Sequence, residues 1–428
     1  MARIEYIRLS LHRPHPNGTS LPLVTPVISD CMEVIENVPQ AYWIDGTPWH
    51  EANLWFLHRG RAVHLHMNAI ATLHACATSL KLYMAYLERE KANWWHFPKQ
   101  WNENILLRYR GYLIGLRQSG ELASSTTKRR MADILVFYKW ILEKRLLDPE
   151  FAPFEERSVY KRVDLFAGFK KTLTIKVNSL SIPDVRNSNG LEDGLLPVAK
   201  SVKDRILFVA KSHASVELHM MLLIAFSTGM RLGSICDLKE KTIDNALNTC
   251  DRRDLFAYLH LGPNVKGAAV KTKFDKEGSV IIPMEVLFAI KSYMSSVRRL
   301  ERKMKSDDSV KELIFLNRFG RPYVRGGKDK SSVINVEIMR LKKSARSLGT
   351  NFDDFKFHRA RATFASEVAA TGITIYGPQK MPMIIGLVRK LLMHKDEQTS
   401  LAYVNFVLEE GILKNWANAF FEKHMLAG

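Results

Sequence analysis

The residues best suited to chemistry lie near the end of the chain, in the stretch LLMHKDEQTSLAYVNF. This stretch places a histidine, His394, nine residues before a tyrosine, Tyr403. A phenol has a pKa of about 10, so a tyrosine acts as a nucleophile only where its surroundings favour the phenolate. Taken alone, the segment is better explained by packing of Tyr403 among apolar neighbours. A catalytic role therefore requires partners elsewhere in the chain.

Two arginines stand where a cation needs an anionic partner. In AFSTGMRLGSICDL an apolar helix is predicted to end at Gly229, and Arg231 follows almost at once. A guanidinium that leaves an apolar wall matches a pair of phosphate oxygens, although the carboxylate of Asp237 is a simpler partner. In FKFHRARATFASEVAATG, His358 and Arg361 stand three residues apart at a predicted helix start, so their side chains face the same way.

A lysine-rich turn is predicted between two strands, LFAYLHLG and GSVIIP. It carries Lys271, Lys273 and Lys276, in the segment GAAVKTKFDKEGSVIIP. Most lysines of this kind are simply solvated. A lysine on a turn can nevertheless reach into a site and donate a proton, which an arginine does poorly because it stays protonated.

The order and local contexts of these residues resemble the tyrosine recombinase family, the phage integrases and their relatives. The helix-ending TG-x-R of that family appears here as TGMR, its H-x-x-R as HRAR, and its terminal motif as MHKDEQTSLAY. The interval from His394 to Tyr403 and the closeness of Tyr403 to the C-terminus also match. The resemblance covers the chain from about Val202 to the end. It implies a catalytic set of Arg231, Lys271, His358, Arg361, His394 and Tyr403.

The chain departs from the family pattern at two positions. Ser234 replaces the acidic residue that often follows the first arginine by three positions, so support for Arg231 must come from elsewhere. Met393 replaces the glycine that usually precedes the histidine, a change that we expect to alter packing more than chemistry. Lys271 fits the position of the family's lysine best. The assignment stays open because Lys273 fits nearly as well and the turn is longer than usual.

The resemblance implies transesterification at a DNA phosphodiester. Tyr403 would form a 3′-phosphotyrosyl linkage and leave a free 5′-hydroxyl, which can attack the same linkage on a partner duplex. Since the bond energy is kept, no ATP, metal or other cofactor is expected. The two arginines and His394 would contact the phosphate, where charge develops in the transition state. His358 would accept the tyrosine proton, and Lys271 would protonate the departing 5′ oxygen.

The sequence thus predicts a site-specific DNA recombinase or integrase that integrates or excises a mobile element. A type IB topoisomerase or a hairpin-forming resolvase would use the same cleavage and differs in what the free 5′ end does next. A DNA-binding architectural or regulatory protein could keep the fold without catalysis. It would be expected to have lost members of the catalytic set, whereas all six residue types are present.

Composition agrees with a nucleic-acid partner. The 428 residues include 63 Lys and Arg against 44 Asp and Glu, a formal net charge of +19, which favours a polyanion. Four scattered cysteines form no CxxC pair and indicate reduced thiols. No apolar run suits a signal core or a membrane span. We therefore expect a cytoplasmic, bacterial or phage-like protein associated with the nucleoid and not with a membrane.

The resemblance also implies how the protein assembles. Four protomers would act together on double-stranded DNA, and the chain would be a monomer or a weak oligomer without DNA. Accessory DNA-bending proteins could assist.

The elements that must position these residues are mostly helical. Apolar residues recur every three or four positions from about Leu65 to Leu87, as on an amphipathic helix. Two further helices are predicted over residues 105–116 and over SSTTKRRMADILVFYKWILEKRLL, where Ser or Thr would cap the start. A stretch rich in Gly, Pro, Asn and Ser, residues 179–202, is predicted to be a linker.

We therefore expect a mostly α fold with a small β-sheet (α+β). Residues 1–60 would form an N-terminal arm or small strand-containing extension. By resemblance, residues 61–178 would be a helical core-binding domain that contacts DNA, and residues 203–428 a tyrosine-recombinase catalytic domain with the DNA breaking-rejoining enzyme fold.

Three adjacent cations, Lys128, Arg129 and Arg130, are predicted in the first turn of the third helix. There they oppose the helix dipole, but together with backbone amides they would suit DNA phosphates. A solvated charged face explains them equally well.

The tail after Tyr403 has an apolar stripe, in which Leu408, Ile412, Trp416 and Phe420 recur every four residues. We expect this helix to dock either on its own catalytic domain or, as in the family, on a neighbouring protomer.

Overall fold

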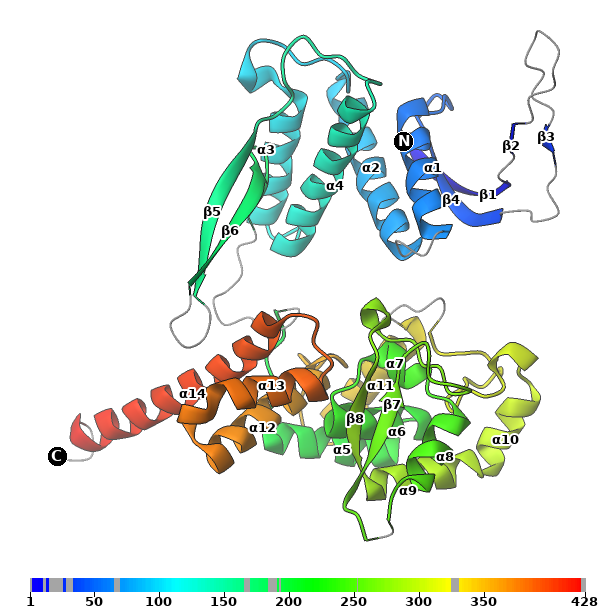
Figure 1. Ribbon diagram of the computed structural model, residues 1–428, viewed down its shortest axis with the longest axis vertical. Coiled ribbons are helices and arrows are strands. Elements are labelled where there is room, and N and C mark those ends of the chain that lie inside the picture. Colours follow the sequence, from blue (N-terminus) through cyan, green and yellow to red (C-terminus); the bar gives the residue numbers. More distant parts are fainter. Residues whose placement is uncertain are drawn as a thin grey trace. The chain divides into compact units, whose positions relative to one another are not determined.

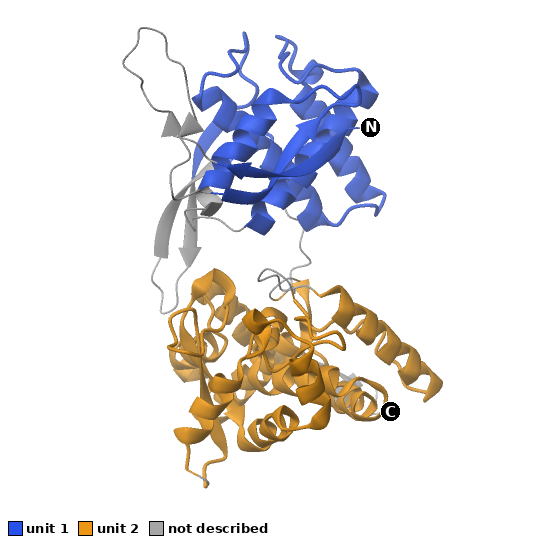
Figure 2. Ribbon diagram, turned by 90° about the vertical axis from the view of Figure 1, so that its right-hand side faces the viewer, with its two compact units in different colours: residues 1–186 blue, residues 187–428 orange. Residues whose placement is uncertain are grey.

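The computed structural model describes residues 2–10, 13–14, 26–27, 34–64, 70–164, 170–183, 191, 194–251, 253–324 and 331–424 (Figure 1). The chain divides into two compact units, Met1–Arg186 and Asn187–Gly428 (Figure 2). Helices dominate both units, and the sheets within the described ranges are two-stranded. The mostly α fold with small sheets predicted from the sequence is confirmed.

The first unit begins with strands and continues with helices. Its strands are β1 (Arg3–Ser10), β2 (Arg13–Pro14), β3 (Pro26–Val27) and β4 (Val34–Tyr42), paired antiparallel as β1 with β4 and β2 with β3. Its helices are α1 (His50–His64), α2 (Ile70–Glu90), α3 (Ile105–Gln118) and α4 (Ser124–Glu143), with a 3₁₀ turn, η1 (Trp101–Glu103), before α3.

Helix α1 belongs to the same core as the helices that follow. Trp55 and Phe56 are buried there with Ala41 of β4 and with apolar residues of α2 and α4. The boundary predicted at residue 60 therefore falls inside α1 and is wrong, because the apolar side of this helix is completed only by its neighbours. The amphipathic pattern predicted for α2 is confirmed by the burial of Leu73, Cys76, Leu80, Met84 and Leu87.

The start of α4 differs from the prediction. Its N-cap residue is Ala123 and not a serine or threonine. Since Ser124 is the first helical residue, Lys128, Arg129 and Arg130 lie in the second turn and not in the first. They are therefore beyond the backbone amides that a helix end offers to an anion.

A long two-stranded ribbon closes the first unit. Strands β5 (Glu156–Asp164) and β6 (Lys170–Asn178) pair antiparallel over their whole length. Leu180 and Ile182, which follow β6, are buried in the core of this unit. The start of the predicted linker at residue 179 is thus too early, because its apolar residues complete a core. The division after Arg186 still falls within the predicted stretch.

The second unit carries the motifs named above. In chain order its main elements are α5 (Lys200–His213), α6 (Val216–Thr228), α7 (Leu232–Cys236), α8 (Glu240–Asn248), β7 (Phe256–Leu261), η4 (Lys273–Asp275), β8 (Gly278–Pro283), α9 (Met284–Met294), α10 (Val297–Met304), η5 (Asp308–Val310), α11 (Ser332–Ser347), α12 (Arg359–Tyr376), η6 (Pro378–Lys380), α13 (Met381–Leu391) and α14 (Glu397–His424).

Helix α6 lies in the middle of this unit, in contact with α5, α7, α9, α12 and β8. Its sequence VELHMMLLIAFST is apolar on nearly every side, as a helix surrounded by protein requires. The predicted hairpin is also confirmed, since β7 and β8 pair antiparallel with Phe256 opposite Pro283. The inward residues of β7, Ala257, Leu259 and Leu261, are buried in the same core.

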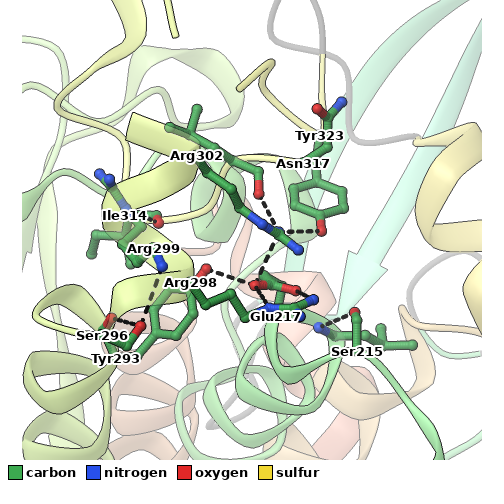
Figure 3. Close-up of polar contacts among 12 residues, drawn as sticks. Ser215, Glu217, Tyr293, Ser296, Arg298, Arg299, Arg302, Ile314, Asn317 and Tyr323 are labelled. Atoms are coloured by element: carbon green, nitrogen blue, oxygen red, sulfur yellow. Dashed lines mark hydrogen bonds and ion pairs between the residues drawn. The ribbon is translucent and has the colours of Figure 1, made fainter. Parts of the chain in front are cut away.

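A buried carboxylate fixes the start of α6 (Figure 3). Glu217 accepts hydrogen bonds from Arg298 Nε at 2.8 Å and from the Tyr293 hydroxyl at 2.8 Å. It also pairs with Arg302 at 2.9 Å. Burial by itself raises the pKa of Glu217, but Arg298 and Arg302 outweigh it and lower that pKa. These contacts join α6 to α9 and α10, so the far end of α6 is held in a defined place.

A second core joins the last three helices of the unit. Phe364 of α12, Ile384 and Val388 of α13, and Tyr403 and Val404 of α14 are buried together. The predicted helix start beside the H-x-x-R motif and the predicted terminal helix are confirmed as α12 and α14.

Candidate active site

The turn after α6 presents the first predicted arginine. Gly229 ends the helix with a φ of 66°, a left-handed conformation that favours glycine. A Cβ at Gly229 would also lie 2.5 Å from Cδ1 of Phe364, so no larger residue fits. Two residues later the partly buried Arg231 stands at the N-cap position of α7. The apolar helix therefore stops abruptly and brings a guanidinium out of the core.

Arg361 comes to the same place from α12. It is only 3% exposed. Its Nη1 donates to the carbonyl of Gly229 at 2.7 Å, and its Nη2 donates to the carbonyl of Leu392 at 2.8 Å. A guanidinium has five N–H donors in a fixed fork, so Arg361 can join the two chain segments and still face a ligand.

A pocket brings the two arginines together. They line it from α7 and α12, while the β7–β8 turn contributes two lysines. The lining includes Arg231, Ser234, Thr272, Lys273, Lys276, Arg361, Leu392 and Met393. Two cations at one small concavity are suited to an anion with two exposed oxygens, such as a phosphodiester.

His394 and Tyr403 form a pair beside this pocket. Their rings are stacked with centroids 5.9 Å apart and planes 10° apart. His394 Nδ1 lies 2.9 Å from Oγ of Ser400, and both His394 and Tyr403 are nearly fully buried. The nine-residue interval therefore spans the turn after α13 and the first turns of α14, which returns the tyrosine to the histidine.

His358 is the residue directly before α12 and is partly buried. Its carbonyl accepts the backbone N–H of Arg361 at 3.2 Å. The two residues thus share the first turn of one helix, as predicted. Among the described residues predicted to be catalytic, His358, Lys271, His394 and Tyr403 do not line the pocket itself.

The phage integrase family matches residues 198–405, the part of the chain that contains all of these elements. This match, over just under half of the chain, identifies a phage integrase domain in the second unit. No curated protein matches its sequence.

One of three similar solved structures supports this assignment at the level of the fold. The chain is similar to the XerH site-specific recombinase in a post-cleavage complex with palindromic difH, with 15% identity over 85% of this chain and 84% of that chain and a TM-score of 0.50. The Tn1549 transposon integrase with transposon right-end DNA has 15% identity over 83% of this chain and 93% of that chain, with a TM-score of 0.49. A lambda integrase dimer on a COC′ core site has 14% identity over 82% of this chain and 94% of that chain, with a TM-score of 0.45. The first likeness supports the catalytic fold expected above.

Two lysines of the turn, Lys273 and Lys276, line the pocket, and the role predicted for Lys271 stays a prediction. Lys271 is exposed and does not line the pocket, whereas Lys276 does. Lys276 Nζ donates to the carbonyl of His394 at 2.6 Å. Burial lowers the pKa of Lys276, and the nearby Arg389 and Arg231 lower it further. In the sequence, Lys276 is one of three lysines of the turn. Its place at the end of the turn, two residues before β8, is the signal that could have distinguished it.

Ser234 and Asp237 explain where Lys271 lies. Ser234 Oγ donates to the Lys271 carbonyl at 2.9 Å, and the Asp237 carboxylate accepts the Lys271 backbone N–H at 2.7 Å. Asp237 also lies 3.6 Å from Lys239 Nζ. These two side chains therefore hold the base of the hairpin turn, and Ser234 connects the Arg231 helix to it.

Met393 shows why the family usually has glycine there. Its φ is 53°, in the left-handed region, which costs a non-glycine residue about 1–2 kcal/mol. Its side chain lies over Gly278, where a Cβ would be 3.1 Å from Met393 Cε and Cγ. The substitution was expected to alter packing. It alters the backbone energy as well.

Outside this site, Lys128 and Arg129 are exposed on α4 and Arg130 is partly buried. Their contact with DNA stays a prediction. Within the ranges that the structure describes, no three His, Cys, Asp or Glu side chains gather closely enough to hold a metal ion. None of the helices in those ranges combines the length and apolarity that a membrane span needs.

Proposed function

We propose that this recombinase cuts and rejoins double-stranded DNA at specific sites through a 3′-phosphotyrosyl intermediate, and thereby integrates or excises a mobile element. The observation that carries the proposal is the convergence of Arg231, Arg361 and Lys276 on one pocket, next to the stacked pair of His394 and Tyr403. These residues come from separate segments of the chain and share one chemical use.

The two arginines supply the electrostatic part of the reaction. A phosphodiester under attack gains charge on its two non-bridging oxygens, and donors already fixed around it lower the barrier. Arg361 is held by the carbonyls of Gly229 and Leu392, so its position does not have to be set when DNA binds. Arg231 would approach the same phosphate from the start of α7.

Tyr403 is the nucleophile in this proposal. In the described structure it is 1% exposed, so the first turns of α14 must shift to bring its oxygen to the phosphate. The cations around the pocket favour the phenolate, and His358 would accept the proton. His394 would hold the phosphate by a hydrogen bond and keep the tyrosine ring in reach by stacking.

Lys276 is the best-placed proton donor for the departing 5′ oxygen. Its ammonium already lies at the pocket, and its lowered pKa makes proton transfer easier. Lys271, which the sequence favoured, and Lys273, which also lines the pocket, remain the alternatives. The general acid is thus still a lysine of the hairpin turn, five residues after the one that the sequence favoured.

Double-stranded DNA is the proposed partner because of the net charge of +19 and because the XerH neighbour was solved on its difH substrate. We also propose that a tetramer forms on DNA from weakly associated protomers, that DNA-bending proteins assist, and that the protein works in the cytoplasm at the nucleoid. The three cations of α4 would contact phosphates from the first unit.

A covalent-trapping experiment tests the proposal. With nicked duplexes drawn from a randomised pool, the wild-type chain should form a protein–DNA adduct that resists SDS, with and without EDTA. Tyr403→Phe should bind the same duplexes and form none, since only the nucleophilic oxygen is removed. An adduct at wild-type level in Tyr403→Phe would refute the mechanism. Joining of strands between two duplexes separates a recombinase from a topoisomerase.

A further inference from the structure

Phe274 stands at the tip of the β7–β8 turn in an unusual state. Its side chain is 67% exposed. Its φ is 65°, and that of Asp275, the next residue, is 49°. Two consecutive non-glycine residues in the left-handed region are uncommon, because each places its Cβ against its own backbone. Neither stability nor solubility favours a strained, exposed phenylalanine at this position.

The surrounding contacts hold the turn in this conformation. Thr272 Oγ1 donates to the Lys276 carbonyl at 2.6 Å and closes the turn. Below it, Asp237 accepts the Lys271 N–H at 2.7 Å. Above it, Lys276 is bonded to His394 O at 2.6 Å. The strain therefore persists because both ends of the turn are fixed, a situation that is typical of functional sites.

Two ammonium groups flank the phenylalanine ring. Lys273 Nζ lies 5.5 Å from the ring centroid, and Lys395 Nζ lies 5.1 Å from it. Lys273 also lines the pocket of Arg231 and Arg361, and Lys395 follows His394 directly in the chain. The ring thus stands beside the phosphate site with a cation from the hairpin and another from the segment before α14.

We propose that Phe274 is a wedge that packs against a base of duplex DNA next to the phosphate held by Arg231 and Arg361, while Lys273 and Lys395 contact the neighbouring phosphates. This inference rests on the proposed function, since it takes the pocket as the site of the scissile phosphate. Proteins that open or kink a duplex insert an apolar side chain between base steps and place cations on the backbone. Phe274 with its two lysines has both parts.

A second exposed phenylalanine in the same unit provides the matched control. Phe319 is 60% exposed, and Arg318 lies over its ring at 4.7 Å. In its turn the left-handed position belongs to Gly320, with a φ of 72°. Its cation Arg318 does not line the pocket, whereas Lys273 beside Phe274 does. Like Phe274, Phe319 is exposed and has a cation beside its ring. Unlike Phe274, it has no left-handed backbone and no flanking cation at the pocket.

The test uses the full-length chain and a duplex selected from a randomised pool by its binding to that chain. The duplex carries 2-aminopurine at each base of the bound site in turn, because this base fluoresces more when it is unstacked. The wild type should raise the fluorescence at a position beside the cleaved phosphate. Phe274→Ala should lose at least four fifths of that rise, and Phe319→Ala should keep it.

A second measurement guards against misfolding. Phe274→Gly should unfold at a higher temperature than Phe274→Ala, since glycine relieves the left-handed strain, and both should lose the fluorescence rise. An unchanged rise in the two Phe274 variants, or no rise at any base with the wild type, overturns the wedge. Adduct formation by the wild type is scored separately, so failure of the cleavage chemistry is distinguished from failure of the wedge.

Discussion

The ammonium of Lys276 donates a 2.6 Å hydrogen bond to the carbonyl oxygen of His394, which lies 118 residues further along the chain. This contact joins the β7–β8 turn to the segment that leads into α14 and to Tyr403. Because it lies at the pocket of Arg231 and Arg361, a phosphate that enters the pocket meets the lysine and the histidine segment together.

Replacement of the lysines should distinguish the proton donor. Lys276→Ala should slow strand cleavage strongly, and a substrate whose 5′ bridging oxygen is replaced by sulfur should restore it, because a thiolate leaves without protonation. Lys271→Ala should cleave the ordinary substrate at nearly the wild-type rate. Single-turnover rates on the two substrates measure this. Rescue of Lys271→Ala alone would return the role to Lys271.

The pH dependence of cleavage follows from the same residue. Only the ammonium form of Lys276 can donate a proton, and its pKa lies below the usual lysine value. The rate of the step should therefore fall as the pH rises through that lowered pKa. In Lys276→Arg the fall should move to higher pH, since arginine keeps its proton. A pH profile of single-turnover cleavage that is identical in both proteins would contradict the assignment.

The two arginines should both contribute to catalysis, and Arg361 should also contribute to stability. Arg231→Ala should raise the barrier by about 3–4 kcal/mol, the scale of losing one fixed donor. Arg361→Ala should slow cleavage comparably and also lower the free energy of unfolding by roughly 1–3 kcal/mol for each carbonyl left without its donor. Urea unfolding and adduct rates measure the two effects. An unchanged free energy of unfolding in Arg361→Ala would mean that Arg361 does not join its segments.

The left-handed conformation of Met393 makes a prediction with an internal control. At residue 393, glycine should be more stable than alanine by about 1 kcal/mol, because only alanine keeps the strain. At Met383, a 48% exposed residue inside α13, alanine should be more stable than glycine by about 1 kcal/mol. Denaturant unfolding of the four variants gives both differences. The same order at both sites would exclude strain at Met393.

The tail should act in assembly more than in folding. Leu408 packs against the core of α12, α13 and α14, whereas Ile412 and Leu413 are 67% and 65% exposed. Replacing both by aspartate should leave binding to a half-site nearly intact and abolish higher-order complexes and strand exchange. The control is Met304→Asp on α10, where the side chain is 85% exposed. Gel-shift titration decides, and unchanged tetramer formation in the double variant would exclude docking on a neighbouring protomer.

Much of the site could be predicted from sequence because its motifs are local. Gly229 and Arg231 are adjacent to the end of one helix, His358 and Arg361 share one helical turn, and His394 and Tyr403 are separated by a fixed interval. Spacing within a turn or a helix is set by backbone geometry, so short motifs predict short-range positions well. The apolar run of α6 likewise predicted the buried helix that ends at Gly229 and leads to Arg231.

Only the tertiary structure decided the features that depend on contacts between distant segments of the chain. The three lysines of the turn are equivalent in sequence, and Lys276 is distinguished because its ammonium meets the His394 carbonyl, while Asp237 and Ser234 hold the backbone of Lys271. The strain at Phe274 and Met393 exists because contacts from other segments fix both turns. The boundary at residue 60 failed because the core of the first unit extends across it. Such outcomes are decided by packing, which no local pattern contains.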